Sequence, residues 1–415
     1  MTHIRQYRCT KCHRVWAYDE EMMVCPDCHD EGILDIEYDY ESIQKVMNRE
    51  YFKNQSQYSL WRYLPLLPVS DRYIDHTLRV GWTPLYRARK LERRYGLKQV
   101  YLKDEGLNPT QSLKDRASVI ACVKAMELGK TIISCSSTGN AASSLAGNAA
   151  KMGLKTVIFV PKRAPIGKLT QLLIFGTTLI KVNGDYKETY QLSKEAIAHY
   201  GWYNRNAAIN PHLIEGKKTV ALEIAEQLSF KPTDWVVVSV GDGCTIGGVY
   251  KGFYDFKQLG LIKKIPKILG VQSSGCSPFY KAFITKKPIQ ETDELTIADS
   301  IAVGIPRNPI KGMDAVVKSN GQFIEVSDEK ILDAMLLLGY DEGVFAEPAA
   351  AASLAGMIQA KEQGIIKPED TVTVIVTGNG LKDTNNALKK VHEPVLLNAN
   401  LNELMRYIER GDKNE

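Results

Sequence analysis

Residues 108–116 read Asn-Pro-Thr-Gln-Ser-Leu-Lys-Asp-Arg, so that Lys114 follows a turn and starts an amphipathic helical pattern. Residues 377–383 read Thr-Gly-Asn-Gly-Leu-Lys-Asp and follow an apolar run typical of a buried strand. A lysine at the start of a helix can direct its amine into a cleft and form a Schiff base with a carbonyl cofactor. Alone, such a lysine is more often a solvated residue of the first turn. Its interpretation therefore depends on the other loops.

The composition is that of an ordinary globular protein. The chain has 415 residues, 44% of them apolar and 24% charged, and a net charge of +5; this length favours about two to three domains. No basic run is interleaved with aromatic residues, so we expect no nucleic-acid partner. No apolar stretch approaches the roughly 18 residues of a membrane helix, and residues 1–8 lack the apolar core of a signal peptide. We therefore expect a cytoplasmic protein with reduced thiols and no membrane partner.

Four of the eight cysteines form two Cys-x-x-Cys pairs near the N-terminus, with twelve residues between the pairs. They are Cys9, Cys12, Cys25 and Cys28. This spacing is close to that with which paired knuckles bind a tetrahedral zinc ion. We predict a structural zinc ribbon over residues 1–37, because four protein ligands leave no open position for catalysis. His13 or His29 could replace a cysteine in the ligand set. Removal of the metal is expected to unfold this segment and leave the remainder folded.

The rest of the chain alternates short apolar runs with helical patterns. After a polar, aromatic connector at residues 38–80, eight runs are predicted as strands: 99–103, 131–135, 156–160, 178–182, 235–240, 267–272, 323–326 and 371–377. The helices predicted between them include 114–128, 217–227 and 347–361. Most runs are continuously apolar, which predicts parallel sheets covered by helices on both faces. Doubly wound sheets of this kind bind ligands at the loops that follow their strands.

Two such loops have residues suited to binding anions. Residues 134–143, Ser-Cys-Ser-Ser-Thr-Gly-Asn-Ala-Ala-Ser, could bind an amino-acid carboxylate at a helix start, although an N-cap and turn is the ordinary alternative. Residues 240–248, Val-Gly-Asp-Gly-Cys-Thr-Ile-Gly-Gly, could bind a phosphate monoester, or their last glycines could merely allow close helix packing. The second loop lacks the Lys-Ser/Thr ending of a nucleotide P-loop. The hydroxyl of Thr377 could reach a ring nitrogen or cap the following turn.

Five sequence blocks occur in the order found in one enzyme family. They are Asn-Pro-Thr-x-Ser-x-Lys-Asp-Arg (108–116), Ser-Thr-Gly-Asn (137–140), Glu-Gly-Lys-Lys-Thr (215–219), Gly-Val-Phe-Ala-Glu-Pro (343–348) and Thr-Gly-Asn-Gly-Leu-Lys-Asp (377–383). From residue 81 to about 383 the chain resembles the fold-type II pyridoxal phosphate (PLP) enzymes, and among them the threonine synthase family. The resemblance implies an α/β fold with two doubly wound, mainly parallel sheet domains of the tryptophan synthase β-like kind.

The resemblance also implies a domain organisation. Residues 81–115 and 201–395 would form the large PLP domain, and residues 116–200 a small domain inserted into it. Residues 396–415 would form a C-terminal helix and tail. Relatives of this fold are commonly dimers, so we expect a homodimer.

The same resemblance implies roles for individual residues. Lys114 would form the Schiff base and shuttle protons, and Asn140 would bond the phenolic oxygen of the cofactor. Ser137 and Thr138 would hold the substrate carboxylate. Thr377 would face the pyridine nitrogen; a hydroxyl there does not keep the pyridine protonated, which favours elimination over transamination. The cofactor phosphate would bind to Gly241, Asp242, Gly243, Cys244 and Thr245.

The chain departs from the family where a substrate phosphate would bind. Threonine synthases usually carry Asn-Ser-Val-Asn-Pro-x-Arg before the Glu-Gly-x-Lys-Thr block, whereas residues 207–213 here read Ala-Ala-Ile-Asn-Pro-His-Leu. Ala207, Ala208 and Leu213 thus remove two hydrogen-bonding groups and one charge, and the loss of a charge-assisted partner typically costs roughly 1.5–3 kcal/mol. Ala141 likewise stands where a threonine is usual. Residues 296–304 are similar to the Thr-Ile-Ala-Asp-Gly-Ile-Ala-Val segment of serine and threonine dehydratases.

These features favour an enzyme that removes a β-substituent, such as a hydroxyl, from a small amino acid. Lys114 would abstract the α-proton and leave an aminoacrylate or aminocrotonate, which would hydrolyse to a 2-oxo acid and ammonia or accept a nucleophile. The alternative is a threonine synthase proper, which converts O-phosphohomoserine and water to threonine and phosphate. Its phosphate would be held by another basic residue; the candidates are Arg116, Lys168 and Arg205. A non-catalytic protein that docks through the zinc ribbon is a hypothesis from another class. His212 and Arg307 could be substrate contacts or ordinary surface residues, and the ordinary interpretation is favoured.

Overall fold

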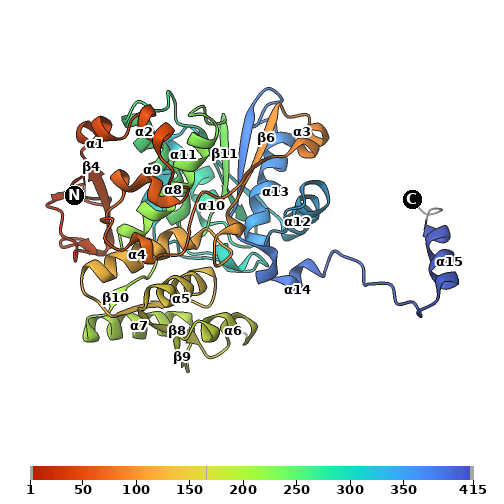
Figure 1. Cartoon of the computed structure of the whole chain (residues 1–415), viewed down its shortest axis with the longest axis horizontal. Helices are drawn as coiled ribbons and strands as arrows, with labels where there is room; N and C mark the ends of the chain where they lie inside the picture. The colour runs from red at the N-terminus through yellow and green to blue at the C-terminus, as the bar shows by residue number, and fades with distance from the viewer. Residues whose placement is uncertain (1–2, 165, 412–415) are drawn as a thin grey trace.

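The computed structural model describes residues 3–164 and 166–411, and the described residues form three β-sheets (Figure 1). The first sheet lies near the N-terminus and is antiparallel, with strand order β2-β1-β4-β3. Its strands are β1 (Ile4–Cys9), β2 (Val15–Trp16), β3 (Val24–Cys25) and β4 (His29–Tyr38). In the longest pairing, Tyr7 lies opposite Ile36 and Cys9 opposite Leu34.

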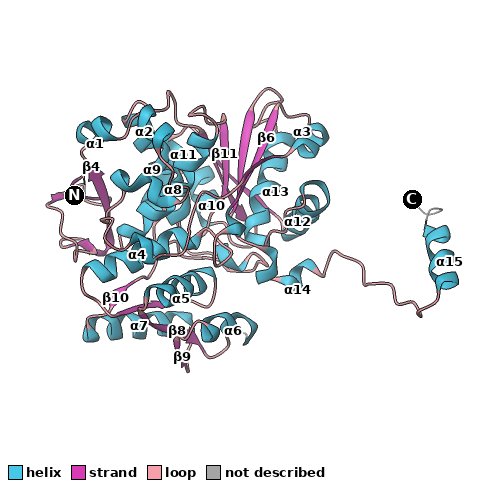
Figure 2. Ribbon diagram, in the orientation of Figure 1, coloured by secondary structure: helices cyan, strands magenta, loops and turns pink. Residues whose placement is uncertain are grey.

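The largest sheet has six strands in the order β13-β12-β11-β14-β6-β5. All neighbours are parallel except β5, which pairs with β6 in the antiparallel direction. The strands are β5 (Leu85–Arg87), β6 (Gln99–Asp104), β11 (Trp235–Ser239), β12 (Lys267–Ser273), β13 (Gln322–Val326) and β14 (Thr371–Val376). All five residues of β11 are buried, as its continuous apolar run predicts for a strand covered on both faces. Figure 2 shows the helices that flank these strands.

A second parallel sheet, in the order β10-β7-β8-β9, lies below the first two in Figure 1. Its strands are β7 (Ile132–Ser136), β8 (Lys155–Pro161), β9 (Thr178–Val182) and β10 (Tyr203–Asn204). The helices of this part are α5 (Asn140–Met152), α6 (Ile166–Ile174) and α7 (Tyr186–Tyr200). All eight predicted strands are confirmed, with ends that differ by one residue at most. The exact domain boundaries stay predictions.

The remaining helices of the body include the three that were predicted. They are α3 (Arg89–Tyr95), α4 (Lys114–Glu127), α8 (His212–Gln227), α9 (Cys244–Gln258), α10 (Pro278–Thr285), α11 (Pro309–Lys318), α12 (Asp328–Glu342), α13 (Pro348–Glu362) and α14 (Thr384–Ala387), with the 3-10 turns η3 (Glu105–Leu107), η4 (Asp299–Ile301) and η5 (Gly380–Lys382). Helix α8 begins at His212, five residues before its predicted start. Lys217 therefore lies in the second turn of this helix rather than at its beginning.

Residues 38–80 are more than a polar connector. They form α1 (Tyr40–Val46), α2 (Arg49–Asn54), η1 (Leu60–Leu66) and η2 (Ile74–His76). Leu60 and Tyr63 are completely buried, and Tyr63 packs in the same core as the apolar residues of α8 and α9. Burial of these aromatic and apolar side chains makes this segment part of the large core.

The C-terminal helix α15 (Leu401–Gly411) lies apart from the body of the molecule, at the end of an extended segment (Figure 1). It lies within residues 396–415, for which a C-terminal helix and tail were predicted, and residues 412–415 lie outside the described residues. Over the described ranges, none of the helices combines the length and the apolar character needed to cross a membrane.

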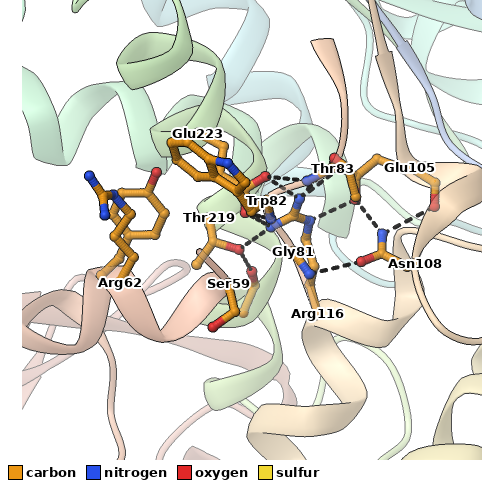
Figure 3. Close-up of polar contacts among 12 residues, drawn as sticks. Ser59, Arg62, Gly81, Trp82, Thr83, Glu105, Asn108, Arg116, Thr219 and Glu223 are labelled. Carbon is orange, nitrogen blue, oxygen red and sulfur yellow. Dashed lines mark hydrogen bonds and ion pairs between the residues drawn. The ribbon is translucent and has the colours of Figure 1, made fainter. Parts of the chain in front are cut away.

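A buried ionic network joins the start of α4 to β6, η3 and α8 (Figure 3). The guanidinium of Arg116 donates to Glu105 at 2.6 and 2.7 Å and to Glu223 at 2.6 and 2.7 Å. Lys103 donates to Glu223 at 2.8 Å, and all four side chains are fully buried. Since Arg116 is committed to two carboxylates, it is not free to hold a substrate phosphate, and that candidate is wrong.

We predict that Arg116→Leu lowers the free energy of unfolding by about 3–5 kcal/mol, because it leaves Glu105 and Glu223 buried without their guanidinium partner. Urea denaturation measures this change. Lys318→Met serves as the control: it breaks an exposed ion pair with Asp314 and is expected to change stability by less than about 1 kcal/mol. An equally small change in Arg116→Leu would show that the network does not stabilise the fold.

Candidate active site

The two stretches that carry Lys114 and Thr377 lie side by side. The Leu113 amide donates to the carbonyl of Thr377 at 2.9 Å, and the Asn379 amide donates to that of Gln111 at 3.1 Å. The block at residues 343–348 joins them, because the Glu347 amide donates to the Gly378 carbonyl at 3.1 Å. Backbone hydrogen bonds therefore bring three of the five sequence blocks to one place, at the carboxyl end of β14.

Lys114 is the first residue of α4, and its side chain is half-buried. Burial lowers the pKa of its ammonium group, and the positive charge of Arg205 lowers this pKa further, although Cys244 and Asp242 act in the opposite direction. Among the described residues, the ammonium has no hydrogen-bond or ion-pair partner. A lysine with a lowered pKa is more readily neutral, which is the form that attacks a carbonyl carbon.

The glycine-rich loop at residues 241–245 forms the start of α9, with Gly243 as the N-cap. Gly243 has a φ of +85°, and a Cβ there would lie 2.4 Å from the carbonyl oxygen of Asn308, so only glycine fits. The loop is braced by the amide of Asn308, which donates to the Asp242 carbonyl at 2.9 Å. The first amides of α9 have no partner within the helix and could bind a phosphate.

Ser137 and Thr138 precede α5, and Thr138 lines a cleft of ≈ 440 Å³ together with Asn140 and Glu347. This volume is in the usual range for small-molecule sites. The Asn140 amide donates to the carboxylate of Glu347 at 2.8 and 3.1 Å and to Ser300 at 3.3 Å. Burial raises the pKa of Glu347. Thr138 and Asn140 of the carboxylate loop thus line the cleft, whereas Ser137 is not among its lining residues, and the binding of a carboxylate there stays a prediction.

Glu347 and Lys382 are charged residues of this cleft that were quoted within sequence blocks but given no role. Glu347 is buried beside Asn140, and Lys382 donates to Ser143 at 3.1 Å and to Gln171 at 3.2 Å. Glu347 directly precedes α13, and Lys382 lies in the turn η5 that follows β14. Charged residues at such positions are candidates for ligand contacts, which is the signal that could have revealed them.

A second set of cations lies near the glycine-rich loop. Lys217 is 2% exposed and has no hydrogen-bond or ion-pair partner in the part of the chain that the structure describes. Burial lowers its pKa to about 8, and the positive charges of Lys114 and Arg205 contribute to this shift. Arg205 is 1% exposed, and the partner of its guanidinium is the neutral hydroxyl of Ser118, at 3.0 and 3.1 Å. Two buried cations without a carboxylate partner leave positive charge for a bound anion.

Several buried polar atoms near these cations have no hydrogen-bond partner among the described residues. They are Oγ of Ser134 and Ser136, Nδ2 of Asn206 and Oδ1 of Asn308. Buried polar groups in folded proteins are nearly always paired, so a cluster of unpaired ones indicates that a ligand or water completes their bonds.

Two expectations for single residues are wrong. His212 is completely buried rather than at the surface, and its ring nitrogens lie 3.1 Å from the hydroxyls of Tyr7 and Tyr203. Arg307 is half-buried between the rings of Tyr186 and Tyr190, with its guanidinium carbon 5.2 and 4.1 Å from their centroids. The sequence could not show that these two positions are covered, because the elements that cover them are distant in the chain. For Lys168, a third phosphate candidate, the side chain lies outside the described residues.

The four N-terminal cysteines form one cluster. Their sulfur atoms all lie within 4.8 Å of one another, and neither His13 nor His29 belongs to the group. Cys9 and Cys25 are buried, Cys28 is half-buried and Cys12 is exposed. The arrangement has the donor set and the compactness that a tetrahedral metal site requires.

Comparison with known proteins fits this geometry. The family described as "Pyridoxal-phosphate dependent enzyme" matches residues 76–378. The chain is 38% identical over 404 residues to a threonine synthase of Methanocaldococcus jannaschii, covering 97% of this chain and 98% of that protein. A threonine synthase of Methanosarcina acetivorans is 37% identical with the same coverage. The chain belongs to the threonine synthase family of PLP-dependent enzymes. The predicted family and PLP-dependent enzyme class are thereby confirmed.

Solved structures of lower identity share the fold. Threonine deaminase isoform 2 from Solanum lycopersicum superposes with a TM-score of 0.67 at 22% identity, covering 80% of this chain and 92% of that one. Diaminopropionate ammonia lyase from Escherichia coli gives a TM-score of 0.65 at 20% identity, covering 76% and 89%. These similarities confirm the predicted fold-type II architecture and carry no information on the substrate.

The residues present fit the PLP cofactor of the family. Among the described residues the Lys114 amine has no partner, and the loop around Gly243 places the first amides of α9, which have no partner within the helix, at the start of that helix. Asn140 and Thr377 lie on the segments that adjoin Lys114. When bound, PLP withdraws electrons from the α-carbon of an amino acid.

We predict that Lys114→Ala abolishes the imine absorbance band that appears when PLP is added to the protein, because the variant has no amine at this position. Turnover is expected to fall at least about 10³-fold. Lys281→Ala, at an exposed position of α10, is the matched control and should keep both properties. Persistence of the band in Lys114→Ala would exclude Lys114 as the Schiff-base residue.

Proposed function

We propose that the protein is a threonine synthase, which converts O-phosphohomoserine and water to threonine and phosphate. The observation that carries this proposal is the buried ammonium of Lys217, which has no partner among the residues that the structure describes. The similarity to threonine synthases over 97% of the chain supports it. This reverses the preference drawn from sequence, which favoured elimination from an unphosphorylated amino acid because three polar residues are replaced by Ala207, Ala208 and Leu213.

Lys217 supplies a cation close to the charge that is absent at Leu213. Residues four apart lie on the same face of a helix, one turn from each other. Leu213 and Lys217 line the same small cavity, together with Ala208 and Cys244 of the glycine-rich loop. The lost arginine is therefore replaced in electrostatic terms by a lysine one turn further along α8. Arg205, buried without a carboxylate, adds a second positive charge to this region.

Each group of residues has a separate role in the proposed reaction. Ser137 and Thr138 hold the substrate carboxylate at the start of α5, and Lys114 accepts the proton from the substrate α-carbon and returns it in a later step. Lys217 and Arg205 bind the phosphoryl group of the substrate and stabilise the phosphate as it leaves. Residues 241–245 bind the cofactor phosphate through the amides of α9.

The small cavity limits how the phosphoryl group is bound. Its volume is ≈ 10 Å³, about the space that a single water molecule needs. The phosphoryl oxygens therefore reach Lys217 from the side of the cofactor, or the cavity wall moves to admit them. That wall includes Ile33 and Leu34 of the N-terminal sheet.

We predict that Lys217→Gln raises the KM for O-phosphohomoserine roughly 10- to 100-fold, since a charge-assisted hydrogen bond is lost. Binding of L-threonine, which has no phosphate, should change little when followed by the absorbance of the bound cofactor. Equal weakening of both ligands, or reduced PLP binding, would instead place Lys217 at the cofactor phosphate.

The pH dependence follows from the lowered pKa of Lys217. The ammonium is charged below about pH 8 and neutral above it, so kcat/KM for O-phosphohomoserine should fall as pH rises through about 8. Lys217→Arg keeps its charge in this range and should lose this limb of the profile. A profile that is identical in wild type and Lys217→Arg would contradict the assignment.

The direct test of the proposed function is an assay of products from three substrates in parallel. O-phosphohomoserine should give phosphate and threonine in equal amounts, whereas L-serine and L-threonine should give little 2-oxo acid or ammonia. The second candidate function, β-elimination from an unphosphorylated amino acid, is favoured by the apolar cluster of Ala207, Ala208 and Ile33. Release of 2-oxo acid and ammonia from L-serine or L-threonine, with O-phosphohomoserine inert, would establish that second function.

A further inference from the structure

The cysteine cluster adjoins the strand that forms part of the wall of the small cavity. Strand β4 begins at His29, directly after Cys28, and carries Ile33 and Leu34, which line the cavity with Lys217. Ile33 packs against Ala208 and Cys244 in a separate apolar cluster. A segment near the N-terminus thus covers the loop that binds the cofactor phosphate.

We propose that Cys9, Cys12, Cys25 and Cys28 bind one zinc ion, and that this metal holds β4 in place as the wall of the substrate pocket. The metal site stands independently of the proposed function; only the use of the pocket for a substrate rests on it.

The geometry of the cluster fits zinc. The sulfur atoms of Cys12 and Cys25 are 3.8 Å apart, close to the edge of a tetrahedron with zinc–sulfur bonds of about 2.3 Å. The amides of Lys11 and Cys12 donate to the sulfur of Cys9 at 3.4 and 3.5 Å. Such donors neutralise thiolate charge and orient metal ligands.

The cysteine cluster is also in close contact with the backbone of β4. A Cβ at Gly32 would lie 2.5 Å from the Cβ of Cys25 and 2.6 Å from that of Cys28. The backbone of β4 is therefore in direct contact with two ligand side chains, one residue before Ile33. Any movement of these ligands is transmitted to the strand at the point where it reaches the cavity.

The remaining contacts of β4 hold its far half on the body. Asp35 pairs with Lys251 at 2.9 Å and with Lys311 at 2.6 Å, and the hydroxyl of Tyr38 donates to Glu215 at 2.8 Å. By contrast, the segment from residue 10 to 28 contains only the two-residue strands β2 and β3 among its regular elements. A segment with so little structure of its own depends on metal binding to stay folded.

Metal loss is therefore expected to release the first half of β4 and leave its second half attached. This differs from the expectation that the ribbon unfolds without effect on the remainder, because the ribbon and the body share one apolar core. Cys244, which is 4% exposed beneath Ile33, would then become accessible to solvent.

The test measures metal content and the alkylation of Cys244 by iodoacetamide in the PLP-bound protein. Wild type and Cys276→Ser, a cysteine outside the cluster, should contain about one zinc per chain, and Cys12→Ser should contain much less. After metal loss, the rate of Cys244 alkylation, read by mass spectrometry of peptides, should rise at least about tenfold, whereas fully buried Cys122 should stay unreacted. The PLP absorbance reports that the body remains folded.

If Cys12→Ser does not fold, chelation of zinc from folded wild type provides the same comparison. Wild-type protein that neither contains zinc nor binds added zinc would overturn the metal site. Loss of zinc with no change in Cys244 alkylation would overturn the role of the metal in holding the wall. Neither readout requires turnover, so failure of the proposed reaction is distinguished from failure of this proposal. Where O-phosphohomoserine is turned over, its KM should rise on metal loss while PLP stays bound.

Discussion

The pairing of Arg116 and Lys103 with Glu105 and Glu223 is the interaction on which the arrangement of the site depends. Two positive and two negative side chains balance one another with no exposure to water. Arg116 follows Lys114 by two residues, so the position of Lys114 at the start of α4 is fixed by partners on η3 and on α8. Since a buried charge without its partner is costly, this set of four tolerates little displacement of any member. Figure 3 shows the contacts of Arg116 with Glu105 and Glu223.

Much of this architecture follows from local sequence patterns. The strands were predictable because buried parallel strands are continuous apolar runs, and Thr178–Val182 was predicted to the residue. The side-by-side position of Lys114 and Thr377 followed from a known order of sequence blocks. The predicted helix 217–227 missed the first five residues of α8, where the Asn210 side chain accepts from the His212 amide at the helix start.

What could not be predicted depends on contacts between distant segments. Lys217 was visible in its motif, but sequence does not show that a lysine is buried and lacks a carboxylate. Arg116 is also a basic residue within a sequence motif. In the structure, however, it is paired with two carboxylates at hydrogen-bonding distance. The difference between a cation available to a ligand and one committed to the fold is set by Glu105 and Glu223, which arrive from separate elements.

The position of Arg307 between Tyr186 and Tyr190 has a consequence for the behaviour of the protein in salt. The arginine belongs to the segment before α11, and the two tyrosines belong to α7, beside the smaller parallel sheet. A guanidinium stacked on aromatic rings is weakly hydrated, and its attraction to the rings is short-ranged. Exposed ion pairs such as Arg94–Asp341 are screened as ionic strength rises. The relative orientation of the two parallel sheets should therefore persist at salt concentrations that weaken the charged contacts of the surface.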